Sequence, residues 1–163
     1  MQVPVPISLL ALLTWAFLCA RIDARERRIP NTLVLAGLLV GALFLLMFHR
    51  SFTGAAPVAA FIGLAFALLL TLPGYALKRL GAGDVKMLAV VGLATDLAFV
   101  AYTIVGAALA LVLWALLAPS YWQRLPTAFR LNCSALAPPL SKVPYAPFLF
   151  CGMCLATALR LTS

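Results

Sequence analysis

The stretch Gly81-Ala82-Gly83-Asp84-Val85-Lys86 decides how this sequence folds, because it places a carboxylate at the start of an apolar run. An ionisable side chain beside a membrane segment is costly, and such residues mark functional sites. Gly81 and Gly83 lack a Cβ and permit close approaches of neighbouring helices. We therefore predict that a helix begins near Asp84 and that this carboxylate takes part in chemistry. The alternative is an acid that only stabilises the first turn of its helix.

The composition indicates a membrane protein. Hydrophobic residues make up 65% of the 163-residue chain and charged residues 10%, whereas charged residues make up about 25% of a typical soluble domain. The formal net charge is +8. Because Lys and Arg collect in the cytoplasmic loops of membrane proteins, we interpret this charge as a signal of orientation. No nucleic-acid partner is expected.

Apolar segments of membrane-spanning character recur along the chain, at residues 4–20, 32–48, 55–72, 85–95, 98–118 and 145–161. The segment 85–95 is short for a membrane span. If 85–95 and 98–118 both cross the membrane, the basic residues before and after this pair of segments lie on the same face of the membrane. If only one of them crosses, these basic residues lie on opposite faces. Ten of the twelve Lys and Arg residues then lie inside, and Arg50 and Arg160 lie outside. We predict an all-α polytopic membrane protein of about six transmembrane helices, one domain (1–163) with both termini outside.

Two other regions carry weaker expectations. Asp96 falls at an outer turn, where we expect a solvated acid with no role. Residues 119–144 form the one long connection, which contains five prolines and Trp122. Because tryptophan favours the membrane–water interface, we expect this connection to lie at headgroup depth.

A second acid lies on the same predicted face as Asp84. Asp23 follows the first apolar segment, within a cluster of four arginines: Arg21, Arg25, Arg27 and Arg28. It is either a solvated acid paired with its neighbours or half of a carboxylate pair with Asp84. An acid near the C-terminus of a helix faces the negative end of the helix dipole, which is unfavourable without a further partner.

Histidine and cysteine chemistry is not expected. His49 is the only histidine and falls on the opposite face from both aspartates, so a Ser-His-Asp or Cys-His mechanism has no base and a zinc site lacks ligands. The four cysteines form no disulfide framework; we interpret Cys151 and Cys154, three residues apart in an apolar helix, as small packing residues. We predict no metal and no cofactor.

Three motifs resemble one family. Gly81-Ala82-Gly83-Asp84 followed by Lys86 resembles the GxGD signature of the type IV prepilin peptidases. Asp23 and the trailing Ile29-Pro30-Asn31 resemble the first aspartate of that family, and residues 143–148 resemble the proline-rich entry to its last helix. The resemblance covers nearly the whole chain in the right order. It implies that Asp23 and Asp84 are catalytic, supported by the motif residues Gly81, Gly83, Lys86, Pro30 and Asn31.

The implied activity is aspartic peptide hydrolysis. Two close carboxylates share one proton, so one acts as a base toward water while the other polarises the scissile carbonyl. Helix-end electrostatics favour the proton on Asp23 and leave Asp84 as the base, although Arg21 and Arg25 could reverse this. The implied substrate is a prepilin cut after a glycine, between a basic leader and an apolar helix. The implied location is the cytoplasmic face of the bacterial inner membrane, with the pilus assembly machinery as a candidate partner.

The sequence departs from the longer members of the family. Those members carry a cysteine-bearing cytoplasmic domain between their first two helices and also methylate the new N-terminus. Residues 21–31 leave no room for such a domain and contain no cysteine. The chain therefore resembles the short, peptidase-only branch that serves Flp-type (tight adherence) pili, and we predict no N-methylation.

Two alternatives remain. A small transporter or channel subunit would use Asp23 and Asp84 as ion or proton sites, but proton pathways usually place their acids near the membrane midplane. A presenilin-like or signal-peptide-peptidase-like protease shares GxGD, but these proteins have more spans and lack Ile-Pro-Asn after the first aspartate.

Overall fold

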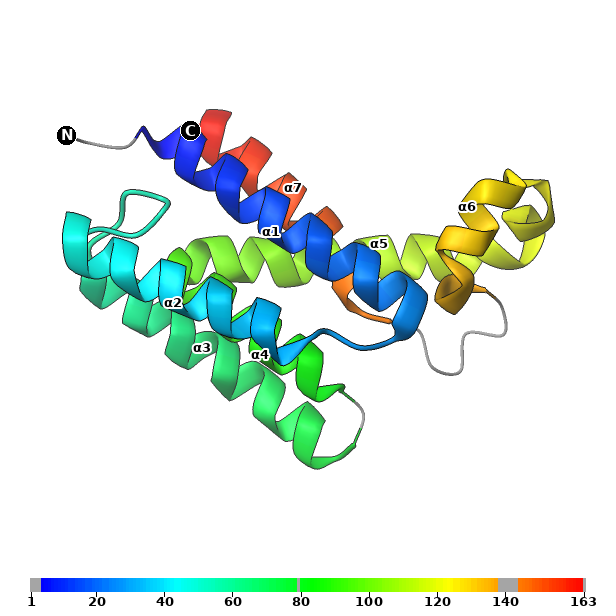
Figure 1. Ribbon diagram of the computed structural model, residues 1–163, viewed down its shortest axis with the longest axis horizontal. Coiled ribbons are helices and arrows are strands. Elements are labelled where there is room, and N and C mark those ends of the chain that lie inside the picture. Colours follow the sequence, from blue (N-terminus) through cyan, green and yellow to red (C-terminus); the bar gives the residue numbers. More distant parts are fainter. Residues whose placement is uncertain (1–3, 79, 138–143, 163) are drawn as a thin grey trace.

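The protein is a bundle of helices (Figure 1). The computed structural model describes residues 4–78, 80–137 and 144–162, and all regular structure in these ranges is helical. The helices are α1 (Val5–Glu26), α2 (Asn31–Phe48), α3 (Pro57–Ala76), α4 (Ala82–Ala94), α5 (Leu97–Tyr121), α6 (Thr127–Asn132) and α7 (Ala146–Thr162), with short 3-10 turns η1 (Trp122–Arg124) and η2 (Ser134–Leu136).

Among the described residues, four helices are long and apolar enough to cross a membrane: α1, α2, α3 and α5 extended through η1. Only 17% to 33% of the residues in their apolar windows are buried inside the bundle, so most of this apolar surface is left for lipid. The predicted all-α, polytopic membrane fold is confirmed. The helix α7 is a shorter apolar helix, and α4 has 13 residues that are mostly buried among the others. That α4 and α7 also cross the membrane stays a prediction.

Successive helices run back and forth between two ends of the bundle. Figure 1 shows both chain ends, the α2–α3 connection and the α4–α5 turn at one end. The end of α1, the start of α2 and the α3–α4 connection lie toward the other end. The helix α4 packs against α2 and α3, and α7 packs against α1 and α5. This alternation brings the C-terminus of α1 and the N-terminus of α4 to the same end of the molecule.

The helices α5 and α7 cross closely at two glycines. A Cβ on Gly106 would lie 2.8 Å from the Cα of Gly152, and a Cβ on Gly152 would lie 2.7 Å from the backbone nitrogen of Ala107. Larger residues at either position would push the helices apart. The close crossing fixes α7 against the bundle, with Leu149 and Met153 fully buried.

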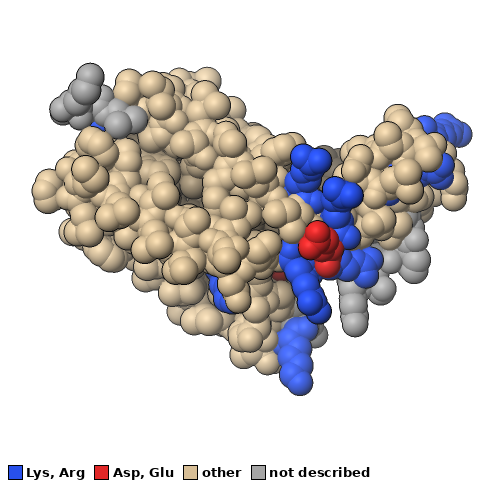
Figure 2. All heavy atoms as spheres, viewed as in Figure 1, with Lys and Arg blue, Asp and Glu red and all other residues tan. Residues whose placement is uncertain are grey.

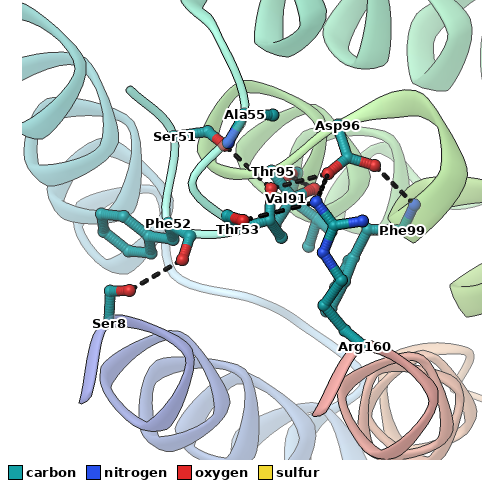
Figure 3. Close-up of polar contacts among 10 residues, drawn as sticks. All are labelled: Ser8, Ser51, Phe52, Thr53, Ala55, Val91, Thr95, Asp96, Phe99 and Arg160. Carbon is teal, nitrogen blue, oxygen red and sulfur yellow. Dashed lines mark hydrogen bonds and ion pairs between the residues drawn. The ribbon is translucent and has the colours of Figure 1, made fainter. Parts of the chain in front are cut away.

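Asp96 is buried, which corrects the expectation of a solvated acid. It is 7% exposed and stabilises the N-terminus of α5 by accepting a hydrogen bond from the backbone N–H of Phe99 (3.0 Å). Thr53 donates to its other oxygen at 2.6 Å, and Arg160 forms an ion pair with that oxygen at 3.4 Å. Figure 3 shows these groups converging from the α2–α3 connection, the start of α5 and the end of α7. Asp96 therefore ties three segments together at the end of the bundle opposite the Asp23 end.

The long connection is partly helical. The helix α5 continues through Pro119 to Tyr121, and η1, α6 and η2 follow. The rings of Trp122 and Trp114 meet edge to face at 6.1 Å, and Trp114 donates to the carbonyl oxygen of Leu136 at 3.3 Å. The connection thus folds back on the bundle. Five residues used in the sequence interpretation lie outside the described residues: Arg79, Pro138, Pro139, Lys142 and Val143.

Candidate active site

Asp23 and Asp84 line one cavity of about 550 Å³ at the end of the bundle where α1 ends and α4 begins. Three of the four acidic residues of the chain are in its wall, because Glu26 also lines it. The two predicted catalytic residues and all five supporting motif residues are brought together here. The full lining is Asp23, Glu26, Arg27, Arg28, Ile29, Pro30, Asn31, Gly81, Ala82, Gly83, Asp84 and Lys86.

The Asp23 side chain is held in place by α7, a helix far from it in the sequence. It lies in the last turn of α1, which ends where Arg27 adopts a left-handed conformation (φ 53) and donates its N–H to the Asp23 carbonyl oxygen at 2.9 Å. The Asp23 side chain is 6% exposed. Its Oδ2 accepts a hydrogen bond from the backbone N–H of Ala146, the first residue of α7, at 3.2 Å. The positive end of the α7 dipole offsets the unfavourable position of Asp23 on its own helix.

Asp84 lies in the first turn of α4, just before the apolar part of that helix and outside the four long spans. Gly81 occupies the N-cap position, so Asp84 is a first-turn residue rather than the cap. Burial, followed by the negative charge of Asp23, raises the pKa of Asp84 to about 7. The two residues line the same cavity, so the charge on one carboxyl group acts on the other. At neutral pH, Asp84 can therefore both hold and release a proton.

The supporting motif residues join the two halves of the cavity. Lys86 Nζ donates to Asn31 Oδ1 at 2.8 Å and so links α4 to the first turn of α2. A Cβ on Gly83 would lie 3.3 Å from the Ile29 side chain, and a Cβ on Gly81 would lie 3.0 Å from Asp84 Oδ2. The glycines therefore leave room for Ile29 and for the Asp84 carboxylate.

Comparison with known families points to the same part of the chain. Residues 10–116, well over half of the chain, match the family model of the type IV leader peptidases. The chain belongs to the type IV leader peptidase family. The matched region contains Asp23, Asp84 and all five supporting residues, and it ends before α7. No curated protein and no solved structure matches the chain.

Lys and Arg gather over the end of the bundle that holds the candidate site, with an acidic side chain among them (Figure 2). The cavity itself is less basic than its surroundings. Its wall carries the acids Asp23, Glu26 and Asp84 and the bases Arg27, Arg28 and Lys86. The wall therefore has as many acidic side chains as basic ones.

Two features of the structure were not predicted from the sequence. The contact of Ala146 with Asp23 has no local signal, since the residues are 123 positions apart. Cys151 and Cys154, interpreted from the sequence as small packing residues, are exposed on the outside of α7 and do not pack inside the bundle. Their small apolar side chains instead suit a lipid-facing surface.

Proposed function

We propose that this protein is a membrane aspartic endopeptidase that removes the short basic leader of prepilins, with Asp23 and Asp84 as the catalytic pair. The observation that carries this proposal is that the two aspartates, from helices far apart in the sequence, line one cavity. Membership of the type IV leader peptidase family supports a prepilin as the substrate. No observation favours the transporter alternative, since both acids lie at one end of the bundle.

We assign unequal roles to the two carboxyl groups. Burial disfavours a negative charge on Asp23, and the N–H of Ala146 partly offsets this cost because a hydrogen bond to the charged form stabilises it. Asp84, whose pKa is raised to about 7, holds the shared proton. This reverses the assignment that helix-end electrostatics suggest from the sequence, because the α7 dipole acts on Asp23 in addition to that of α1.

The hydrolytic step then follows from these two protonation states. Asp23 removes a proton from water as the water oxygen attacks the scissile carbonyl carbon, and Asp84 donates its proton to the carbonyl oxygen. Collapse of the resulting diol returns a proton to Asp84 and breaks the C–N bond. The proton held by Asp23 passes to the departing amine, which restores the starting state.

The position of the site suggests where the substrate is cut. The candidate site lies at the end of the bundle where basic residues gather, which is the cytoplasmic end by the positive-inside rule. We propose that the protein resides in the bacterial inner membrane and cleaves at its cytoplasmic face. Because α1 and α2 are joined by residues 27–30 alone, no methylating domain lies between them, and Flp-type prepilins processed without N-methylation are the proposed substrates.

The test uses a synthetic peptide with a basic leader, a glycine, a phenylalanine and an apolar helix of about 20 residues, the length that spans a bilayer. Purified protein in lipid vesicles should cut the peptide after the glycine, and mass spectrometry should show a free N-terminal amine on the product even with S-adenosylmethionine present. Asp23→Asn and Asp84→Asn should each abolish cleavage. The control, Glu26→Gln, changes a charge in the same cavity and should keep most activity. Cleavage by either Asn variant would overturn the proposal.

A further inference from the structure

A second, smaller cavity adjoins Asp84 from inside the bundle. It measures about 180 Å³ and lies between α3, α4, α5 and α7. Its wall includes Leu70, Leu88, Ile104, Tyr145, Leu149 and Asp84. The hydroxyl of Thr71, also in the wall, already donates to the carbonyl oxygen of Ala67 at 2.7 Å. Asp84 and the tip of Tyr145 are therefore the polar groups left in an otherwise apolar chamber.

Asp84 thus lines two cavities of opposite character. One is the larger, charged cavity of about 550 Å³, and the other is the apolar cavity of about 180 Å³. Pockets for whole small molecules measure about 300–1,000 Å³. The apolar cavity is below that range and suits a single side chain. Leu70 in its wall is 49% exposed on the outside of the bundle, so the cavity borders the lipid-facing surface.

We propose that the apolar cavity binds the side chain of the residue immediately after the scissile bond, while the polar leader occupies the larger cavity. This inference rests on the proposed function. A peptide whose scissile carbonyl lies at Asp84 must extend to both sides of that residue. Its apolar part gains most by leaving water for the apolar chamber, and its charged part by staying in the charged one. The exposed position of Leu70 leaves the rest of the substrate helix a path into lipid.

Ile104 is the specificity-determining residue by which this assignment can be tested. It is half-buried, comes from α5 and lines the apolar cavity but not the charged one. Two peptides are compared that differ only in the residue after the glycine, phenylalanine in one and alanine in the other. Ile104→Phe fills the cavity and should lower the phenylalanine-to-alanine ratio of cleavage rates roughly tenfold or more, the range over which hydrophobic pockets discriminate.

The matched control is Val105→Phe, the same size of change at the next position of α5. Val105 is 57% exposed on the lipid-facing surface, and its substitution should leave the ratio unchanged. Ile104→Ala enlarges the cavity and should favour a third peptide, with tryptophan after the glycine, relative to alanine. A ratio taken on one membrane preparation is independent of how much protein folds.

The outcomes separate the two proposals. If the wild-type protein cleaves the peptides but both Ile104 variants leave every ratio unchanged, the apolar cavity is not the subsite, and the proposed function stands. If the wild-type protein cleaves none of the peptides, the proposed function fails and the subsite with it.

Discussion

The carboxylate of Asp23 accepts a hydrogen bond from the backbone N–H of Ala146, and this contact joins the last turn of α1 to the first turn of α7. Ala146 lies outside the residues that match the leader peptidase family, whereas Asp23 lies within them. Part of the environment of one candidate catalytic residue is therefore supplied by a helix beyond the matched region. Because the donor is a backbone group, the contact does not use the Ala146 side chain, which is fully buried.

Removing that single donor should impair catalysis without unfolding α7. Ala146→Pro deletes the N–H at the first position of a helix, where proline is well tolerated. A hydrogen bond to a charged group contributes about 1.5–3 kcal/mol, so cleavage should fall roughly tenfold or more. Ala146→Gly keeps the N–H and should stay close to wild type.

The measurement is the cleavage rate of the synthetic peptide as a function of pH. The pH optimum of the proline variant should shift, because a negative charge on Asp23 is less favoured without the N–H. Equal rates and equal pH profiles for the proline and glycine variants would exclude this role.

The two aspartates should act as one unit. Asp23→Asn and Asp84→Asn should each abolish cleavage, and the double variant should be no worse than either single one, because parts of one catalytic unit are not additive. Rates are compared in vesicles that hold equal amounts of each variant. Losses that multiply in the double variant would mean that the aspartates act independently.

The rate should depend on pH through the shared proton. The pKa of Asp84 is raised to about 7 by burial and by the charge of Asp23, so cleavage should decline as pH rises through about 7 and Asp84 loses its proton. Cleavage should fall again in acid, where Asp23 becomes protonated and can no longer accept a proton from water. A rate that keeps rising well above pH 7 would contradict the assignment of Asp84 as the proton donor.

The stability of the folded protein should also depend on pH through Asp84. An unfolded aspartate has a pKa of about 3.9, so the folded state binds more protons than the unfolded state between about pH 4 and 7. The contribution of Asp84 to stability is therefore fully present below that window and is lost as pH rises through about 7. Asp84→Asn should remove this dependence, as measured by thermal unfolding in detergent over a pH series. The same slope in wild type and variant would show that other groups cause it.

At the opposite end, Asp96 should matter for stability and not for chemistry. Asp96→Ala removes the cap of α5 and the partner of Thr53 and Arg160, and an N-cap alone contributes about 1 kcal/mol. Asp96→Asn keeps a capping oxygen and should cost less. Thermal unfolding should rank wild type above Asn and Asn above Ala, while cleavage per folded molecule stays within about twofold. A complete loss of cleavage by folded Asp96→Asn would point to an unrecognised role.

The orientation can be tested by cysteine labelling. In a variant without the four native cysteines, a cysteine at Arg25 should resist an impermeant thiol reagent in intact cells, because the basic end faces the cytoplasm. A cysteine at Ala56 should react, since that residue is exposed at the opposite end; Ser51, on the same connection, is 2% exposed and unsuitable. Labelling at position 25 in unlysed cells would reverse the proposed topology.

Local sequence patterns determined much of this protein. The apolar segments predict the long helices because their lengths match a bilayer, and the basic clusters divide the loops between two faces. The motifs that resemble the type IV prepilin peptidases, Gly81 to Asp84 and Asp23 with Pro30-Asn31, picked out much of the lining of the charged cavity, because these residues lie at helix ends that meet at one end of the bundle.

Only the tertiary structure decided which groups far apart in the sequence meet. The burial of Asp96 depends on Thr53 and Arg160 converging from two other segments. The partner of Asp23 is a backbone N–H, which every residue except proline carries. The residue type at position 146 therefore does not indicate the contact. The apolar cavity beside Asp84 is enclosed by four helices, and its size is set by how closely they pack. Apolar segments and loop charges predict which ends of helices lie on the same face of the membrane. Contacts across the bundle depend instead on how the shapes of all the helices fit together.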